Sequence, residues 1–186
     1  EAAGAAMLCI HGRTRAQGYA PGVNRAVIRA VKQAVRIPVL ANGDIYTPAD
    51  ALSMLAETGC DGIMVARGAM GRPWLFAEIR AALRGEDYTP PDPEQRFDIA
   101  LEQVRAMIRE KGDRVGLAEA KKHLAWYCTG LDGAAECRAR IMRAGSLDEM
   151  QTAVRALAAA QDGRLRALPP RSSGAEDPEK TGGVLR

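Results

Sequence analysis

Three short apolar runs are the feature that most constrains the fold of this chain. They are "AAMLCI" (5–10), "IPVLA" (37–41) and "GIMVA" (62–66). Each run is nearly continuous rather than alternating, which is typical of strands buried on both faces of a parallel sheet. Segments with helical spacing follow the three runs, at 24–35, 47–59 and 72–83. This alternation predicts parallel strands joined by right-handed crossovers.

The segment 47–59 carries signals at both of its ends. Thr47 has the side chain of an N-cap, and Pro48 suits the first helical position because proline lacks the N–H that would be unpaired there. Gly59 suits the left-handed residue that follows a helix. We therefore expect a helix bounded by these residues directly after the second strand.

The composition changes at "RGEDYTPPDPEQ" (84–95), whose prolines and charges are typical of a linker. Beyond it we expect four helices in a small bundle, from Pro93, over about 116–128, over about 133–144 and from Ser146. The sequence after 162 has no sustained period and is expected to be disordered. The predicted domains are 1–90, 91–162 and a tail at 163–186.

Three strand–helix units by themselves would form only a small open sandwich. The pattern favours a different interpretation, in which they are the C-terminal three βα units of a TIM (β/α)₈ barrel. The predicted fold is therefore α/β, with this part of a barrel followed by a small all-α bundle. In such barrels, ligand chemistry lies at the carboxyl ends of the strands, and phosphate groups often bind to the last two loops.

The residues that follow the three strands are polar and rich in glycine. They read "HGRTRAQGY" (11–19), "NGD" (42–44) and "ARGAMGRPW" (66–74). Glycine allows a ligand to approach the backbone closely, and backbone N–H groups near a helix start can hold phosphate. Asn42 and Asp44 offer hydrogen bonds, and Arg67 offers a permanent charge. One such loop alone would be read as an ordinary turn, but two adjacent loops beside a basic first loop favour a site for a phosphorylated cofactor.

The first of these loops places Arg13 and Arg15 two and four residues after His11. In an extended loop this alternation would send both arginines in the same direction. They could then form a cationic rim over a cofactor or a phosphate backbone. An ordinary solvated loop is the alternative, and the residues alone leave both open.

Composition and charge limit the kinds of partner and site that this chain is expected to have. The formal net charge of +3 permits a polyanionic partner without requiring one. No apolar run approaches the roughly 20 residues that a membrane-spanning helix needs, so we expect no membrane association. The four cysteines form no C-x-x-C pair, which argues against a zinc site. We expect mostly buried, reduced cysteines in a cytoplasmic protein, with no bound metal.

Four motifs in order now suggest a family. They are "HGRTRAQGYAPG", "IPVLANGDI", "GIMVARGAMGRPWLF" and "KKHLAWYCTGLDGA". Together they resemble the bacterial tRNA-dihydrouridine synthases, closest to the B-type branch, in a match that covers most of the chain before the tail. "NGD" alone is a weak signal, whereas its spacing from the histidine loop and from the third strand end is specific.

The resemblance implies an FMN-dependent barrel enzyme with an appended helical domain. NADPH reduces the FMN in this family, the flavin gives hydride to C6 of a tRNA uridine, and a cysteine protonates C5. By the resemblance, Asn42, Gly43 and Asp44 match the FMN-binding tripeptide, and His11 matches a histidine near the flavin ring. A Gly-Arg pair of the family falls at positions 66 and 67, where this chain departs by carrying Ala66 before Arg67.

The resemblance also implies residues that contact RNA, and these are Arg13, Arg15, Lys121, Lys122, His123 and Arg138. The catalytic cysteine and a flavin-binding lysine of the family are expected upstream of this chain, which we therefore expect to be an inactive fragment when alone. The implied partner is tRNA rather than DNA, and the implied state is a monomer. Two alternatives remain, a dihydroorotate- or enoate-type flavin oxidoreductase that acts on a small molecule and a non-catalytic tRNA-binding fragment.

Overall fold

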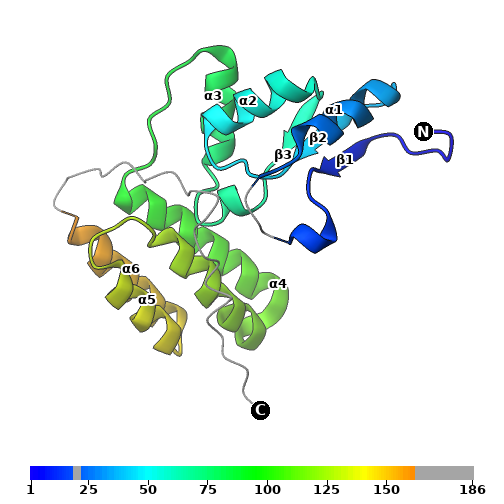
Figure 1. Ribbon diagram of the computed structural model, residues 1–186. Coiled ribbons are helices and arrows are strands. Elements are labelled where there is room, and N and C mark those ends of the chain that lie inside the picture. The colour runs from blue at the N-terminus through cyan, green and yellow to red at the C-terminus, as the bar shows by residue number, and fades with distance from the viewer. Residues whose placement is uncertain (19–21, 162–186) are drawn as a thin grey trace. The chain divides into compact units, whose positions relative to one another are not determined.

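The structure, a computed structural model, describes residues 1–18 and 22–161. The described residues form two compact units, of which the first is Glu1–Gly68 and the second begins at Ala69 (Figure 1). Contacts thus divide the chain at this point, whereas the domain boundary expected after residue 90 stays a prediction. The tail expected at 163–186 lies outside the described residues.

The first unit contains a parallel sheet of three strands, β1 (Leu8–His11), β2 (Val39–Asn42) and β3 (Gly62–Met64), in that order. The strands pair in register, with Cys9 opposite Leu40 and Leu40 opposite Gly62. The predicted alternation is confirmed, because α1 (Arg25–Ala34) and α2 (Pro48–Thr58) connect successive parallel strands. Whether these units belong to a closed barrel stays a prediction.

The two faces of this sheet differ. Val39 and Ala41 are fully buried on one face, where α1 and α2 contact the strands. On the other face Cys9 is exposed and Met64 is 48% exposed, and their sulfur atoms lie 3.4 Å apart. The expectation of burial on both faces is therefore wrong for β1 and β3, because both helices of this unit pack on the same side.

Helix α2 begins and ends as its sequence predicts. Thr47 accepts a hydrogen bond from the Asp50 N–H, and the Asp50 carboxylate accepts from the N–H groups of Tyr46 and Thr47. Gly59 adopts the left-handed conformation, with φ 67°. These caps fix the point at which the chain leaves the second strand-end loop and enters the helix.

The second unit is helical. Its helices are α3 (Leu75–Arg84), α4 (Pro93–Tyr127), α5 (Ala134–Arg143) and α6 (Leu147–Ala159). The backbone of α4 is non-helical at Gly112, with φ 76° and ψ 163°. The chain reverses there, because side chains contact one another between Gln103 and His123 and between Lys111 and Glu119. After α3, the described residues thus contain the four helical segments that the sequence predicts (Figure 1).

The core of the helical unit is formed mainly by α4, α5 and α6. Its largest fully buried side chains are Phe97, Leu101, Leu124, Ile141, Met150, Val104 and Val154. Cys128 and Cys137 lie in the same core, with 3.7 Å between their sulfur atoms. Along with Cys60 they are buried, as predicted for most of the cysteines. No helix in the described ranges is both long and apolar enough to cross a membrane.

Candidate functional site

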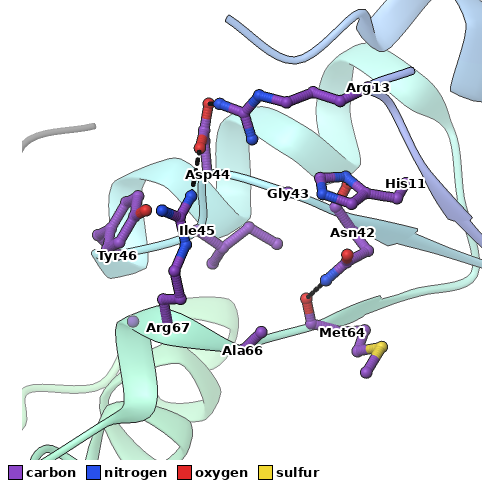
Figure 2. A pocket seen from close by; sticks show the side chains of 11 residues that line it. His11, Arg13, Asn42, Gly43, Asp44, Ile45, Tyr46, Met64, Ala66 and Arg67 are labelled. Carbon is purple, nitrogen blue, oxygen red and sulfur yellow. Dashed lines mark hydrogen bonds and ion pairs between the residues drawn. The ribbon is translucent and has the colours of Figure 1, made fainter. Parts of the chain in front are cut away.

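A cavity of about 230 Å³ lies at the carboxyl ends of the three strands (Figure 2). It brings together the whole set of residues expected to bind a cofactor, namely His11, Asn42, Gly43, Asp44, Ala66 and Arg67. Arg13, Ile45, Tyr46, Met64 and Gly68 complete the lining. The cofactor-binding roles stay predictions, but the sequence correctly predicts that these loops meet at one place.

Asn42 ties the three strand ends to one another. Its side-chain amide donates to the carbonyl oxygen of Met64 at 2.8 Å. Its own carbonyl oxygen lies 3.2 Å from Nδ1 of His11 and accepts from the Gly12 N–H. A carbonyl oxygen only accepts hydrogen bonds, so this contact favours the proton on Nδ1 and leaves Nε2 of a neutral His11 as an acceptor.

Two glycines allow the strand-end loops to pack without a gap. Gly43 has φ 122°, and a Cβ there would lie 2.7 Å from the Val23 side chain and 2.9 Å from the His11 ring. A Cβ on Gly68 would lie 2.2 Å from the carbonyl oxygen of Ile45. The second and third loops therefore touch through backbone atoms, which is the close approach that glycine permits.

The charges of the cavity centre on Asp44, whose carboxylate lies between two arginines (Figure 2). Arg13 Nη2 lies 2.5 Å from Oδ2, and Arg67 Nη2 lies 3.7 Å from Oδ1. The side chains of Arg13, Asp44 and Arg67 are 2%, 15% and 26% exposed. Exposure thus increases from Arg13 to Arg67, so Arg67 is the cation that an incoming ligand can reach most easily.

Of the two possibilities that the sequence left open for Arg13 and Arg15, the shared cationic rim does not form, because Arg13 alone of the two lines the cavity. Thr14 caps a short 3-10 helix, η1 (Arg15–Gln17), and exchanges hydrogen bonds with Gln17. This turn ends the extended conformation that the alternation argument requires. Arg13 consequently lines the cavity while Arg15 is exposed. The Thr-x-x-Gln spacing of a capping box was the sequence signal for this turn.

The start of α2 already uses several of its own backbone donors. Thr47 accepts from the Asp50 N–H, the Asp50 carboxylate accepts from the N–H groups of Tyr46 and Thr47, and this carboxylate adds negative charge at the helix start. An anion would therefore gain little at this helix start, although sequence reasoning assigned such N–H groups to phosphate binding. In this cavity Arg67 is the more suitable partner for an anion.

The residues expected to contact RNA in the helical unit have varied surroundings. Lys121 Nζ donates to the Met142 carbonyl oxygen at the end of α5, and Lys122 lies 5.6 Å from the centre of the Trp126 ring. Arg138 is exposed on α5. Lys121 thus stabilises a helix end, which sequence reasoning did not foresee.

His123 is half-buried between two neighbours. Its Nδ1 lies 3.3 Å from the side-chain amide nitrogen of Gln103, and its ring meets the Trp126 ring edge-on at 4.9 Å. Burial, followed by the nearby Lys122 charge, lowers the pKa of His123 below its ordinary value. His123 is therefore a weak source of positive charge at neutral pH, and its expected RNA contact stays a prediction.

Comparisons with known proteins agree with the motif pattern. The sequence model of the family described as "Dihydrouridine synthase (Dus)" matches residues 1–162. A "Probable tRNA-dihydrouridine synthase" of Mycobacterium leprae is 43% identical over 152 residues, which cover 81% of this chain and 40% of the relative. A "Probable tRNA-dihydrouridine synthase 1" of Synechocystis sp. is 45% identical over 148 residues, covering 79% and 41%. The chain spans about two fifths of the length of these curated relatives.

Proposed function

The chain belongs to the dihydrouridine synthase family, and from this premise we propose that it carries the flavin-phosphate part of an enzyme that reduces uridine to 5,6-dihydrouridine in tRNA. Curated bacterial relatives bear the name tRNA-dihydrouridine synthase, and enzymes of this kind are oxidoreductases. The proposal includes FMN as cofactor, NADPH as reductant and action as a monomer in the cytoplasm. The observation that carries it is the convergence of the family-matching strand-end residues on one cavity.

The residues present fit the phosphate end of FMN. Arg67 offers a guanidinium that can hold phosphate oxygens in a bidentate manner. The loops leave no room for a Cβ on Gly43 or Gly68, so backbone forms part of the cradle. A volume of about 230 Å³ is smaller than the roughly 300–1,000 Å³ of whole-ligand sites, which suits the phosphate and ribityl part of the cofactor.

Three further residues of the cavity have a definite task in this proposal. Asn42 keeps the strand ends together, and His11 would offer Nε2 as an acceptor to the flavin. Ala66 keeps its backbone N–H and adds only a methyl group where the family has glycine. When bound, the flavin supplies the hydride chemistry, while these side chains bind and orient it.

The rest of the catalytic machinery would lie outside this sequence. We propose that the three strand–helix units are the last three of a (β/α)₈ barrel and that the proton-donating cysteine belongs to the part of the enzyme that this chain does not span. The chain alone would then bind flavin without reducing tRNA.

The helical unit is proposed to contact the tRNA. A uridine inside a folded tRNA has to leave its stack to reach a flavin, so the enzyme must hold the surrounding RNA. Exposed Arg15 and Arg138 are the best placed of the expected residues to contribute charge to that surface. Lys121 and Lys122 already have intramolecular contacts, so they would contribute less.

A chimera tests the proposal. The matching stretch of the Mycobacterium leprae relative is replaced by residues 1–162 of this chain, and dihydrouridine is measured in tRNA from cells that lack their own synthases. We expect modified tRNA from the chimera and none from its Arg67→Ala variant. Arg80→Ala, which changes an exposed arginine on α3, serves as the control.

Two results would contradict the proposal. The first is a folded chimera that leaves tRNA unmodified. The second is a chimera that reduces a small enone but not tRNA, which would favour the small-molecule oxidoreductase instead.

A further inference from the structure

Arg13 is the most deeply buried charge of the strand-end cavity, and its role is not explained by a surface contact. Its side chain is 2% exposed, and Nη2 pairs with Oδ2 of Asp44 at 2.5 Å. This burial points to a role inside the cavity, whereas the RNA contact that the resemblance assigned to Arg13 stays a prediction.

The carboxylate that Arg13 contacts would otherwise oppose an anionic ligand. Asp44 lines the same cavity as Arg67, the cation proposed to bind phosphate. Its Oδ1 is buried, and within the described residues it has no hydrogen-bond partner, only the ion pair with Arg67 at 3.7 Å. Without Arg13, the charges of Asp44 and Arg67 would cancel. With Arg13, the three side chains carry a net charge of one positive unit.

Asp44 has a backbone conformation that non-glycine residues rarely adopt, so this arrangement is maintained against some backbone strain. Asp44 has φ 50°, and among the described residues it is the one non-glycine residue with a positive φ. Aspartate and asparagine tolerate this conformation better than most residues. The loop therefore holds a carboxylate at the point where Arg13 can reach it from the first strand end.

We propose that Arg13 is a positioning residue that neutralises Asp44 and so keeps Arg67 effective toward the cofactor phosphate. Arg13 touches no ligand in this role. It holds Oδ2 on the inner side of the cavity, so that Asp44 neither repels the phosphate nor draws Arg67 into a tight pair. This inference rests on the proposed FMN site and adds the residue that sets its charge.

The test measures how much the phosphate contributes to flavin affinity. Dissociation constants of FMN and of riboflavin, which lacks the phosphate, are measured by flavin fluorescence with the full 186-residue chain. The ratio of the two constants reports the contribution of the phosphate. The Arg13→Met variant should lose roughly ten- to fiftyfold in FMN affinity, because one uncompensated charge acts over several ångströms at intermediate dielectric. Riboflavin affinity should change less than about twofold, because riboflavin carries no charge for Asp44 to repel.

A second substitution keeps the test valid if Arg13→Met folds poorly. The double variant Arg13→Met, Asp44→Asn removes both charges of the buried pair, and asparagine suits the positive φ. It should regain most of the FMN preference that Arg13→Met loses. Circular dichroism melting curves establish that each variant is folded.

The outcomes distinguish the two proposals. If the wild-type chain binds FMN no more tightly than riboflavin, the proposed phosphate site and the proposed role of Arg13 are both wrong. If the wild-type chain prefers FMN and Arg13→Met keeps that preference, only the role of Arg13 is wrong. Loss of riboflavin and FMN binding to the same extent in Arg13→Met, without recovery in the double variant, would also overturn it, because it would indicate a merely structural residue.

Discussion

The strand-end cavity contains the buried side chain of Arg13 and the helical unit contains that of Arg96, and these two arginines make different contacts. Arg13 pairs with a carboxylate in a wall of the cavity. Arg96, which is 5% exposed, donates to the carbonyl oxygens of Tyr127 and Thr129 and lies over the Trp74 ring. Burial lowers the pKa of Arg96 below its ordinary value. One arginine thus balances charge beside a cavity, while the other closes the end of a helix.

This difference shows why burial alone does not identify a functional arginine. The carbonyl at Tyr127 belongs to the last turn of α4, where no intrahelical donor remains. Arg96 supplies that donor, so its contacts indicate a structural role. Arg13 instead meets a carboxylate whose second oxygen is near another cation. A surplus of charge beside a cavity suits a ligand site, and Arg13, Asp44 and Arg67 provide one.

The tight backbone contact at Gly68 provides the largest expected effect. In the Gly68→Ala variant the new Cβ would lie 2.2 Å from the Ile45 carbonyl oxygen, and backbone cannot rotate away as a side chain can. We expect a loss of about 3 kcal/mol in the free energy of unfolding, measured by urea titration. Gly145→Ala is the control, because its nearest neighbour is a side-chain oxygen at 3.9 Å. Equal stabilities of the two variants would show that the strand-end loops are less rigid than their geometry indicates.

Arg96→Met tests the structural role of the second arginine. Methionine can pack on Trp74 but leaves the Tyr127 carbonyl without its donor, so we expect a loss of about 2 kcal/mol in the free energy of unfolding. The matched control is Arg155→Met, which removes half-exposed ion pairs to Glu94 and Asp98 and should cost less than about 1 kcal/mol. Urea titration in low and high salt distinguishes the two losses, because salt screens only the surface ion pairs and should reduce only the loss of Arg155→Met. A loss for Arg96→Met no larger than that of the control would remove the distinction between the two regions.

The sequence predicts the elements of both regions better than it predicts their contacts. Strand and helix periodicity is local, and so are the caps at Thr47 and Gly59, which is why the order of elements is confirmed. The Arg13–Asp44 pair joins residues 31 positions apart and depends on a turn that begins at Thr14. Lys121 reaches the end of α5 across 21 positions. Neither contact follows from spacing along the chain, because each depends on how separate elements come together.

Tyr127→Phe gives the smallest expected effect, and it tests a buried polar contact of the helical unit. The Tyr127 hydroxyl donates to the Gln103 side-chain oxygen at 2.8 Å, so its removal should cost about 1 kcal/mol in the free energy of unfolding at pH 8. Tyr88→Phe, at an exposed tyrosine, should change that value by less than about 0.5 kcal/mol.

The same hydroxyl predicts a pH dependence with a definite sign. Burial raises the pKa of Tyr127 from its ordinary value of 10.0 to about 12. The folded chain therefore holds this proton more tightly than the unfolded chain, and the stability that results is complete below pH 10 and lost as the pH rises from 10 to 12. The difference in the free energy of unfolding between wild type and Tyr127→Phe should therefore be smaller at pH 11 than at pH 8, as measured by urea titration. A gap that stays constant would mean that Tyr127 titrates as a solvated phenol, and the helical core would then be more open than its burial indicates.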